Sequence, residues 1–227
     1  MTLAGSAVRL VQRCGRACPP AFAAWVGGVL GWAVGGLPGR EQSRARAHLA
    51  RAYPQATPAW IRRTARAGFR HFGRMALWNL VTLGRPVRHL ARGLIVEGAE
   101  HLRASIARTR AGQGVVICSG HLGNWELLAR TTTLILPCSI IGRRLRDPDL
   151  DALVRDLRRG EGSQVIYQDE GARPALRALR DGRVLATLPD QDVPRLTSIL
   201  VPWYGIPAAT PSGPAQLALL SRCPLQT

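Results

Sequence analysis

The sequence predicts an α/β fold in which helices cover a mostly parallel sheet. From residue 114 onward short apolar runs alternate with amphipathic helical segments, a pattern typical of strand-helix-strand units. Glycine and proline separate these segments, and 227 residues suit a single α/β domain with a short appendage. The predicted strands are 94–97, 114–118, 138–142, 163–167 and 183–188, and the predicted helices are 101–110, 124–133, 148–159 and 172–180.

Upstream of the sheet the chain is helical and basic. Residues 41–85 are rich in Ala and Arg, with helix breaks at Tyr53-Pro54 and Thr57-Pro58. Residues 1–110 contain 18 arginines against 3 acidic residues, out of a net charge of +17 for the whole chain. Arginines alternate with aromatic residues here, which suits anionic lipid, an acidic protein or nucleic acid. The sequence has no helix-turn-helix or zinc-finger pattern, so we expect no nucleic-acid partner.

Residues 21–37 contain no charge and lie between arginine clusters. As a helix this segment spans about 25 Å, slightly less than the roughly 30 Å hydrocarbon core of a bilayer. It suits a thin transmembrane span, an interfacial helix, a signal peptide or a glycine-rich core helix. Trp25 and Trp32 share one helix face between the flanking arginines, which favours membrane association. We therefore predict a membrane-anchoring segment at 1–40 and a second domain at 41–227.

The five cysteines form no Cys-x-x-Cys pair and have no neighbouring histidines at zinc-site spacing. Cys14 and Cys18 would suit a metal pair, but nothing else in the sequence completes such a site, so we expect no metal. The odd count and the position of Cys118 inside a predicted strand favour a reducing compartment.

The segment 114–126 carries the strongest chemical signal. A buried strand is followed by a glycine-rich turn with His121, and then by a helix for which Asn124 is a suitable N-cap. On one continuous helix His121 and Glu126 would point about 140° apart, so they meet only if His121 lies outside the helix and its ring folds back over the first turn. In that arrangement Glu126 would hold one ring nitrogen and leave the other free as a base. The alternative is a turn histidine satisfied by backbone groups beside a solvated carboxylate.

Three ordered blocks carry a family resemblance. Gly120-His-Leu-Gly-Asn-Trp-Glu126 resembles the His-x-x-x-x-Asp/Glu signature of the glycerolipid acyltransferase superfamily, in the form found in bacterial lipid A biosynthesis (late) acyltransferases. The segments 179–192 and 201–218 resemble the Pro-Asp-Gln/His-Asp block and the Val-Pro-Phe-Phe-Gly block of that family, and 46–54 resembles its N-terminal helical region. The likeness extends roughly over residues 20–225 and implies a glycerolipid acyltransferase-like fold. Members of this family continue beyond the position of Thr227, so the resemblance also implies a domain that is incomplete at its C-terminus.

The resemblance implies an O-acyltransferase in which His121 deprotonates the acceptor hydroxyl and Glu126 orients His121. Arg143, Arg158 and Asp190 fall at or near substrate-binding positions, although Arg158 also suits a solvated helix residue and Asp190 an ordinary turn residue. The implied donor is acyl carrier protein or acyl-CoA, with no further cofactor. The implied acceptor is a lipid A precursor, an anionic glycolipid, at the cytoplasmic face of a bacterial inner membrane.

Other readings stay open at this point. A phosphatidylinositol mannoside or other glycolipid acyltransferase uses a similar box around its histidine. A non-catalytic basic membrane-surface protein and a hydrolase are the alternatives from other classes.

Overall fold

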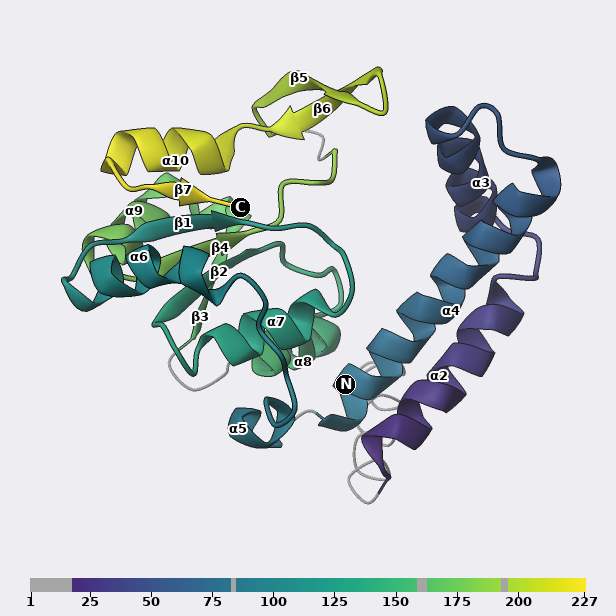
Figure 1. Ribbon diagram of the computed structural model, residues 1–227, viewed down its shortest axis with the longest axis horizontal. Helices are drawn as coiled ribbons and strands as arrows, with labels where there is room; N and C mark the ends of the chain where they lie inside the picture. Colours follow the sequence, from purple (N-terminus) through teal and green to yellow (C-terminus); the bar gives the residue numbers. More distant parts are fainter. Residues whose placement is uncertain (1–17, 83–84, 159–162, 193–195) are drawn as a thin grey trace. The chain divides into compact units, whose positions relative to one another are not determined.

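The computed structural model describes residues 18–82, 85–158, 163–192 and 196–227. These residues fall into two compact units (Figure 1). The helical unit comprises the residues up to Thr82 together with Trp203–Gly205, and the sheet unit comprises the other residues from Arg85 onward. The domain boundary predicted after residue 40 falls at the first residue of the second described helix, inside the helical unit.

The helical unit contains α2 (Pro20–Val34), α3 (Arg40–Ala52) and α4 (Pro58–Thr82), so both predicted helix breaks are confirmed. Helices α2 and α4 pack closely because glycines face each other across the contact. A Cβ atom at Gly27 would collide with the carbonyl oxygen of Gly73, and one at Gly31 with the carbonyl oxygen of Phe69. The small residues of α2 therefore face α4, and its large side chains face outward.

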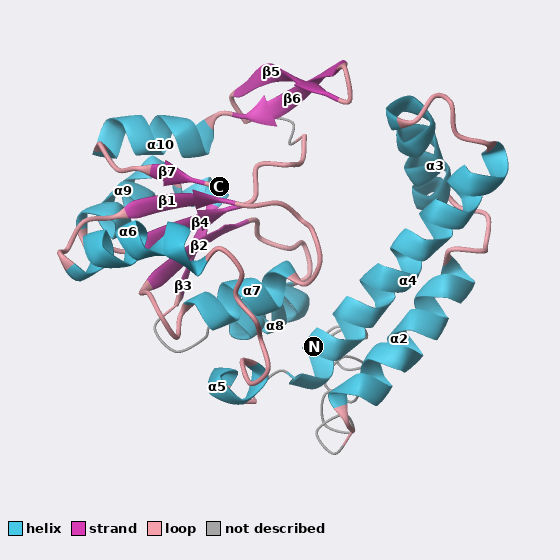
Figure 2. Cartoon of the chain, viewed as in Figure 1, coloured by secondary structure: helices cyan, strands magenta, loops and turns pink. Residues whose placement is uncertain are grey.

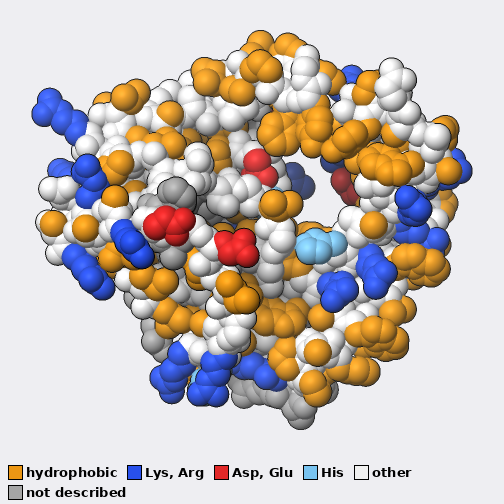
Figure 3. All heavy atoms as spheres, viewed as in Figure 1, with side chains coloured by type: hydrophobic (Ala, Val, Ile, Leu, Met, Phe, Trp, Pro, Cys, Tyr) orange, Lys and Arg blue, Asp and Glu red, His pale blue; other side chains and the backbone are white. Residues whose placement is uncertain are grey.

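The outward face of α2 and of the turn after it is apolar. None of the helices within the described ranges combines the length and the apolarity needed to cross a membrane. Hydrophobic and arginine side chains lie side by side on this unit (Figure 3). The exposed large apolar residues are Phe22, Trp25, Val29, Leu30, Trp32, Val34 and Leu37.

The sheet unit confirms the predicted α/β class (Figure 2). Its main sheet contains β1 (Val115–Cys118), β2 (Cys138–Gly142), β3 (Gln164–Tyr167), β4 (Val184–Thr187) and β7 (Leu225–Gln226) in the order β3-β2-β4-β1-β7. Each neighbouring pair in this order is parallel. Strand β4 lies between β1 and β2, and its last residue, Thr187, is in register with Cys118 at the end of β1.

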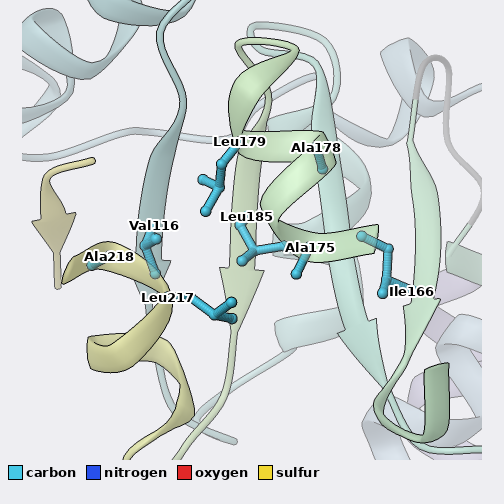
Figure 4. Packing of buried hydrophobic residues seen from close by; sticks show 8 residues of the cluster. All are labelled: Val116, Ile166, Ala175, Ala178, Leu179, Leu185, Leu217 and Ala218. Atoms are coloured by element: carbon cyan, nitrogen blue, oxygen red, sulfur yellow. The ribbon is translucent and has the colours of Figure 1, made fainter. Parts of the chain in front are cut away.

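Helices cover the two faces of this sheet. They are α6 (Ala99–Arg110), α7 (Trp125–Thr132), α8 (Pro148–Arg158), α9 (Ala172–Arg180) and α10 (Gly213–Ser221). On one face Val116 and Leu185 pack against Ala178 and Leu179 of α9 and Leu217 of α10 (Figure 4). On the other face Val184 and Ile140 pack with side chains of α6 and α7. This alternation follows from the two-residue side-chain repeat of a strand.

The strand predicted at 94–97 is wrong. These residues lie in an irregular segment after the short helix α5 (Val87–Leu90), and Ile95 is 87% exposed. Gly93 and Gly98 flank the segment with φ values of 83° and 72°, which bend the chain away from an extended path. An apolar run without a buried face does not form a sheet strand. Beyond the predicted elements lie η1 (Gln168–Glu170) and a two-stranded sheet of β5 (Ser198–Trp203) and β6 (Ile206–Pro211).

Candidate active site

His121 and Asp190 form a close pair at the carboxyl edge of the sheet. Each lies three residues beyond one of the register partners Cys118 and Thr187, so the adjacent strands β1 and β4 deliver both residues to the same level. Asp190 Oδ2 accepts the backbone N–H of His121 at 2.6 Å, and its Oδ1 lies 2.7 Å from His121 Nδ1. Both side chains are about one third exposed (29% and 33%). The carboxylate thereby favours the tautomer with the proton on Nδ1 and leaves Nε2 as an acceptor.

The predicted pairing of His121 with Glu126 is not what the structure contains. Glu126 instead accepts hydrogen bonds from Arg158, with Nε at 3.2 and 3.3 Å from its two oxygens and Nη2 at 3.0 Å from Oε1. As predicted, His121 lies outside α7 and Asn124 caps the helix, its Oδ1 accepting the N–H of Leu127. Glu126 lies in the first turn of α7, buried on the side that faces α8. The predicted position of His121 outside the helix is therefore confirmed, and its predicted pairing with Glu126 is wrong.

Trp125 fixes the imidazole from a second side. Its ring meets that of His121 edge-on, with the centroids 5.0 Å apart at an interplanar angle of 70°. Gly120 lets Asp190 approach, because a Cβ atom there would lie 3.3 Å from Asp190 Oδ2. Gly123 adopts a φ of 61° in the same turn, which favours glycine. The position of the ring is thus set by contacts that local sequence alone does not reveal.

A cavity of about 840 Å³ opens beside this pair, within the sheet unit. His121, Trp125, Glu126 and Arg158 lie on its wall, and so does Arg143, which is exposed and follows β2. Much of the remaining lining is apolar, including Leu102, Ile106, Ile117, Leu128, Leu136, Ile140, Leu188, Leu217 and Leu220. A largely apolar cavity with a few charged and polar lining groups is typical of a site for an amphipathic ligand.

A polar network holds the segment that carries Arg143. Arg144 pairs with Asp169 and Glu170 at 2.9 Å each, and its guanidinium carbon lies 3.8 Å from the centre of the Tyr167 ring. Tyr167 donates its hydroxyl to Asp151 at 2.8 Å, and Asp151 also accepts the N–H of Leu145. That N–H lowers the pKa of Asp151, whereas burial and the bond to Asp151 raise the pKa of Tyr167.

Arg130, which none of the sequence motifs above includes, lies four residues after Glu126 on α7. Its side chain is buried, and Nη2 donates to the backbone carbonyl of Arg85 at 3.1 Å. Nε and Nη1 have no hydrogen-bond partner among the described residues. Burial lowers the pKa of Arg130, and the charge of Glu126 partly offsets this. Arg130 follows Glu126 by four residues, and this spacing in the sequence could have indicated that both lie on one side of the helix.

In the described ranges, no three His, Cys, Asp or Glu side chains gather in a way that would hold a metal ion. Cys18 Sγ lies 3.5 Å from the carbonyl oxygen of Pro19, while Cys14 lies outside the described residues.

Residues 3–227 match the family described as bacterial lipid A biosynthesis acyltransferase. The chain belongs to this family. It is also 33% identical over 143 residues to phosphatidylinositol mannoside acyltransferases from two strains of Mycobacterium tuberculosis, CDC 1551 / Oshkosh and ATCC 25618 / H37Rv. The matched segment covers 58% of this chain and 43% of the length of those relatives.

Within this acyltransferase family member, a base and a cation both line the same cavity. The imidazole is oriented through Nδ1, so that Nε2 is the nitrogen available for a proton. Arg158 is held by a carboxylate in the two-point manner that fixes a guanidinium plane. Such an arrangement suits proton removal from a hydroxyl next to an anionic group.

Proposed function

We propose that this protein transfers a fatty acyl group from a thioester to a hydroxyl of a lipid A precursor. The observation that carries the proposal is His121 on the wall of a largely apolar cavity, with its Nδ1 held by Asp190, in a chain of the lipid A biosynthesis acyltransferase family. An oriented imidazole beside an apolar space is what acyl transfer to an alcohol requires.

In the proposed reaction Nε2 of His121 takes the proton of the acceptor hydroxyl while the hydroxyl oxygen attacks the thioester carbonyl carbon. The tetrahedral intermediate then collapses as the C–S bond breaks, and the imidazolium returns the proton to the departing thiolate. Asp190 stabilises the imidazolium through Nδ1–H at 2.7 Å. The ester forms directly, so no acyl-enzyme is needed and no cofactor beyond the thioester takes part.

The cavity suits both halves of an acylated sugar phosphate. Its apolar lining matches a fatty chain, since the burial of each methylene group is worth about 0.8 kcal/mol. Arg143 and Arg158, which line the same cavity as His121, supply guanidinium groups for phosphate or acidic-sugar oxygens. In this assignment Asp190 acts on His121, and Glu126 acts on Arg158.

The proposed donor is acyl carrier protein or acyl-CoA, both acidic, and the basic N-terminal half would steer an acidic donor. We place the protein at the cytoplasmic face of a bacterial inner membrane. The apolar outer face of α2 beside the arginines of α4 supports an interfacial helix, which inserts its apolar side at the headgroup boundary.

A second candidate acceptor is a phosphatidylinositol mannoside. It is favoured by the 33% identity to mycobacterial acyltransferases of that name. Both acceptors are phosphate-bearing glycolipids with hydroxyl groups, so the same base and the same cations would serve each.

The test is mass spectrometry of glycolipids from cells with and without the gene, together with a reaction of purified protein, acyl donor and each acceptor. We expect the acceptor mass to rise by one acyl unit when the gene is present. Release of free fatty acid without an acylated glycolipid would identify a hydrolase instead. An unchanged acceptor and an unchanged donor would refute the proposal.

A further inference from the structure

Arg158 reaches the cavity wall through space that a glycine leaves empty. Gly142 is the buried last residue of β2, and a Cβ atom built on it would lie 2.6 Å from Nη1 of Arg158. A methyl group at this position and the present guanidinium cannot coexist. The colliding atom is the far end of a flexible side chain, so Arg158 would move aside while the backbone of β2 stays in place.

The same guanidinium is held from its other edge by Glu126, whose charge is shared. Arg130 lies four residues after Glu126 on the same side of α7, and both are buried. A single carboxylate cannot neutralise two guanidinium groups, so these three side chains together keep a net charge of +1. If Arg130 were absent, Glu126 would neutralise Arg158 alone, and the attraction of this wall for an anion would fall.

The burial of the Arg130 guanidinium costs free energy of folding. Two donor nitrogens of Arg130, Nε and Nη1, have no hydrogen-bond partner among the described residues, and its one bond goes to a neutral carbonyl. A buried cation held this way adds little stability compared with an apolar side chain of similar size. The charge of Arg130 instead acts on Glu126, which binds Arg158 at the cavity wall.

We propose that Gly142 and Arg130 are positioning residues for Arg158: Gly142 leaves the space for its guanidinium, and Arg130 prevents Glu126 from neutralising it fully. This inference rests on the proposed function, because it assigns Arg158 to an anionic group of the acceptor. It adds two residues to the site that act through the side chain of Arg158.

The test compares G142A, R130M and R158Q with wild type in two assays. The first is equilibrium binding of a phosphorylated, acylated glucosamine disaccharide in detergent, and the second is the KM and kcat of acyl transfer to the same compound. Loss of a charged hydrogen-bonding partner corresponds to about tenfold or more in Kd, which we expect for R158Q. We expect smaller rises, about three- to tenfold, for G142A and R130M. The changes should appear in KM, with kcat within about threefold of wild type.

Three comparisons separate positioning from a general loss of structure. R130K keeps the charge and should recover most of the binding lost in R130M. G142A should add nothing in an R158Q background, because the two changes act through the same guanidinium. G68A, which places a methyl group in open space on α4, and R180Q, which removes an exposed arginine at the end of α9, are matched controls that should bind as wild type.

The inference is overturned if G142A and R130M bind the disaccharide as tightly as wild type, or if G142A weakens the R158Q protein further. It is also overturned if wild type does not bind this compound at all. Binding with the expected pattern but without acyl transfer would refute the proposed function and leave the positioning of Arg158 intact. Thermal unfolding of each variant identifies any that misfold. G142A and R130M change different elements, so the misfolding of one still leaves the other as a test.

Discussion

Replacing Asp190 by Asn isolates the contact on which the proposed chemistry depends. The substitution keeps the shape of the side chain and removes its charge, so the amide no longer selects the Nδ1–H tautomer of His121 or stabilises the imidazolium. Two bonds are affected, at 2.6 Å to the backbone N–H and at 2.7 Å to Nδ1. The catalytic effect comes from the second, because the backbone N–H can still bond to the amide oxygen.

The magnitude follows from that bond and its exposure. A hydrogen bond to a charged group contributes about 1.5–3 kcal/mol, and a buried catalytic triad can lose about 10⁴-fold in kcat when its carboxylate becomes an amide. Here His121 and Asp190 are 29% and 33% exposed, so water partly replaces the lost interaction. We therefore expect a loss of about 2–3 kcal/mol, which is about 30- to 150-fold in kcat.

The matched variant is E126Q, which alters the residue that the sequence predicted as the partner of His121. Glu126 contacts Arg158, so E126Q should raise the KM for the glycolipid and reduce kcat less than D190N does. Steady-state transfer of a radiolabelled acyl group, with D181N as an exposed control, measures both constants. A loss of kcat in E126Q that equals or exceeds that in D190N would refute the assignment of roles.

Three further results are expected. Burial raises the pKa of the Cys138 thiol to about 12. Peptide mass mapping should therefore show that Cys138 resists iodoacetamide at pH 8 in the native protein and reacts after denaturation. Rapid labelling of the native protein would contradict the burial of Cys138. The Leu145 N–H lowers the pKa of Asp151, so the contribution of Asp151 to stability is present above the unfolded pKa of 3.8 and is lost as the pH falls through the lower folded pKa. In urea titrations the stability difference between wild type and D151N should therefore shrink below pH 3.8. A difference that stays constant with pH would argue against this role of the Leu145 N–H. G27A should destabilise the helical unit by about 1–3 kcal/mol in thermal unfolding, because its methyl group would push α2 away from the Gly73 carbonyl, whereas G68A should have little effect.

The elements of the sheet unit could largely be predicted because their signals are local. Residues 138–142 and 172–180 coincide with β2 and α9, and other predicted bounds differ from the observed ones by one or two residues. Asn124 was recognised as an N-cap from its residue type and from the apolar periodicity after it. The error at 94–97 has the opposite cause, since an apolar tetrapeptide cannot show locally whether it has a surface to pack against.

The partner of His121 could not be predicted because sheet order is a long-range property. Alternating strands and helices indicate parallel strands, but they do not reveal that β4 lies beside β1 while β2 lies one strand further away. With that order known, the equal offsets of His121 from Cys118 and of Asp190 from Thr187 predict their contact. The Pro-Asp pair after β4 carried a signal for a site residue, but its role required the neighbouring strand.

The spacing of the His-x-x-x-x-Glu segment takes on a different meaning in this structure. Side chains five residues apart diverge by about 140° on a helix, and the turn before α7 does not bring these two back together. His121 faces the end of β4 and pairs with Asp190, while Glu126 faces α8 and pairs with Arg158. The motif thus supplies a base at one position and fixes a cation at another, along the same cavity. Divergence is useful here, because a carboxylate bonded to His121 would leave Arg158 without the partner that orients it.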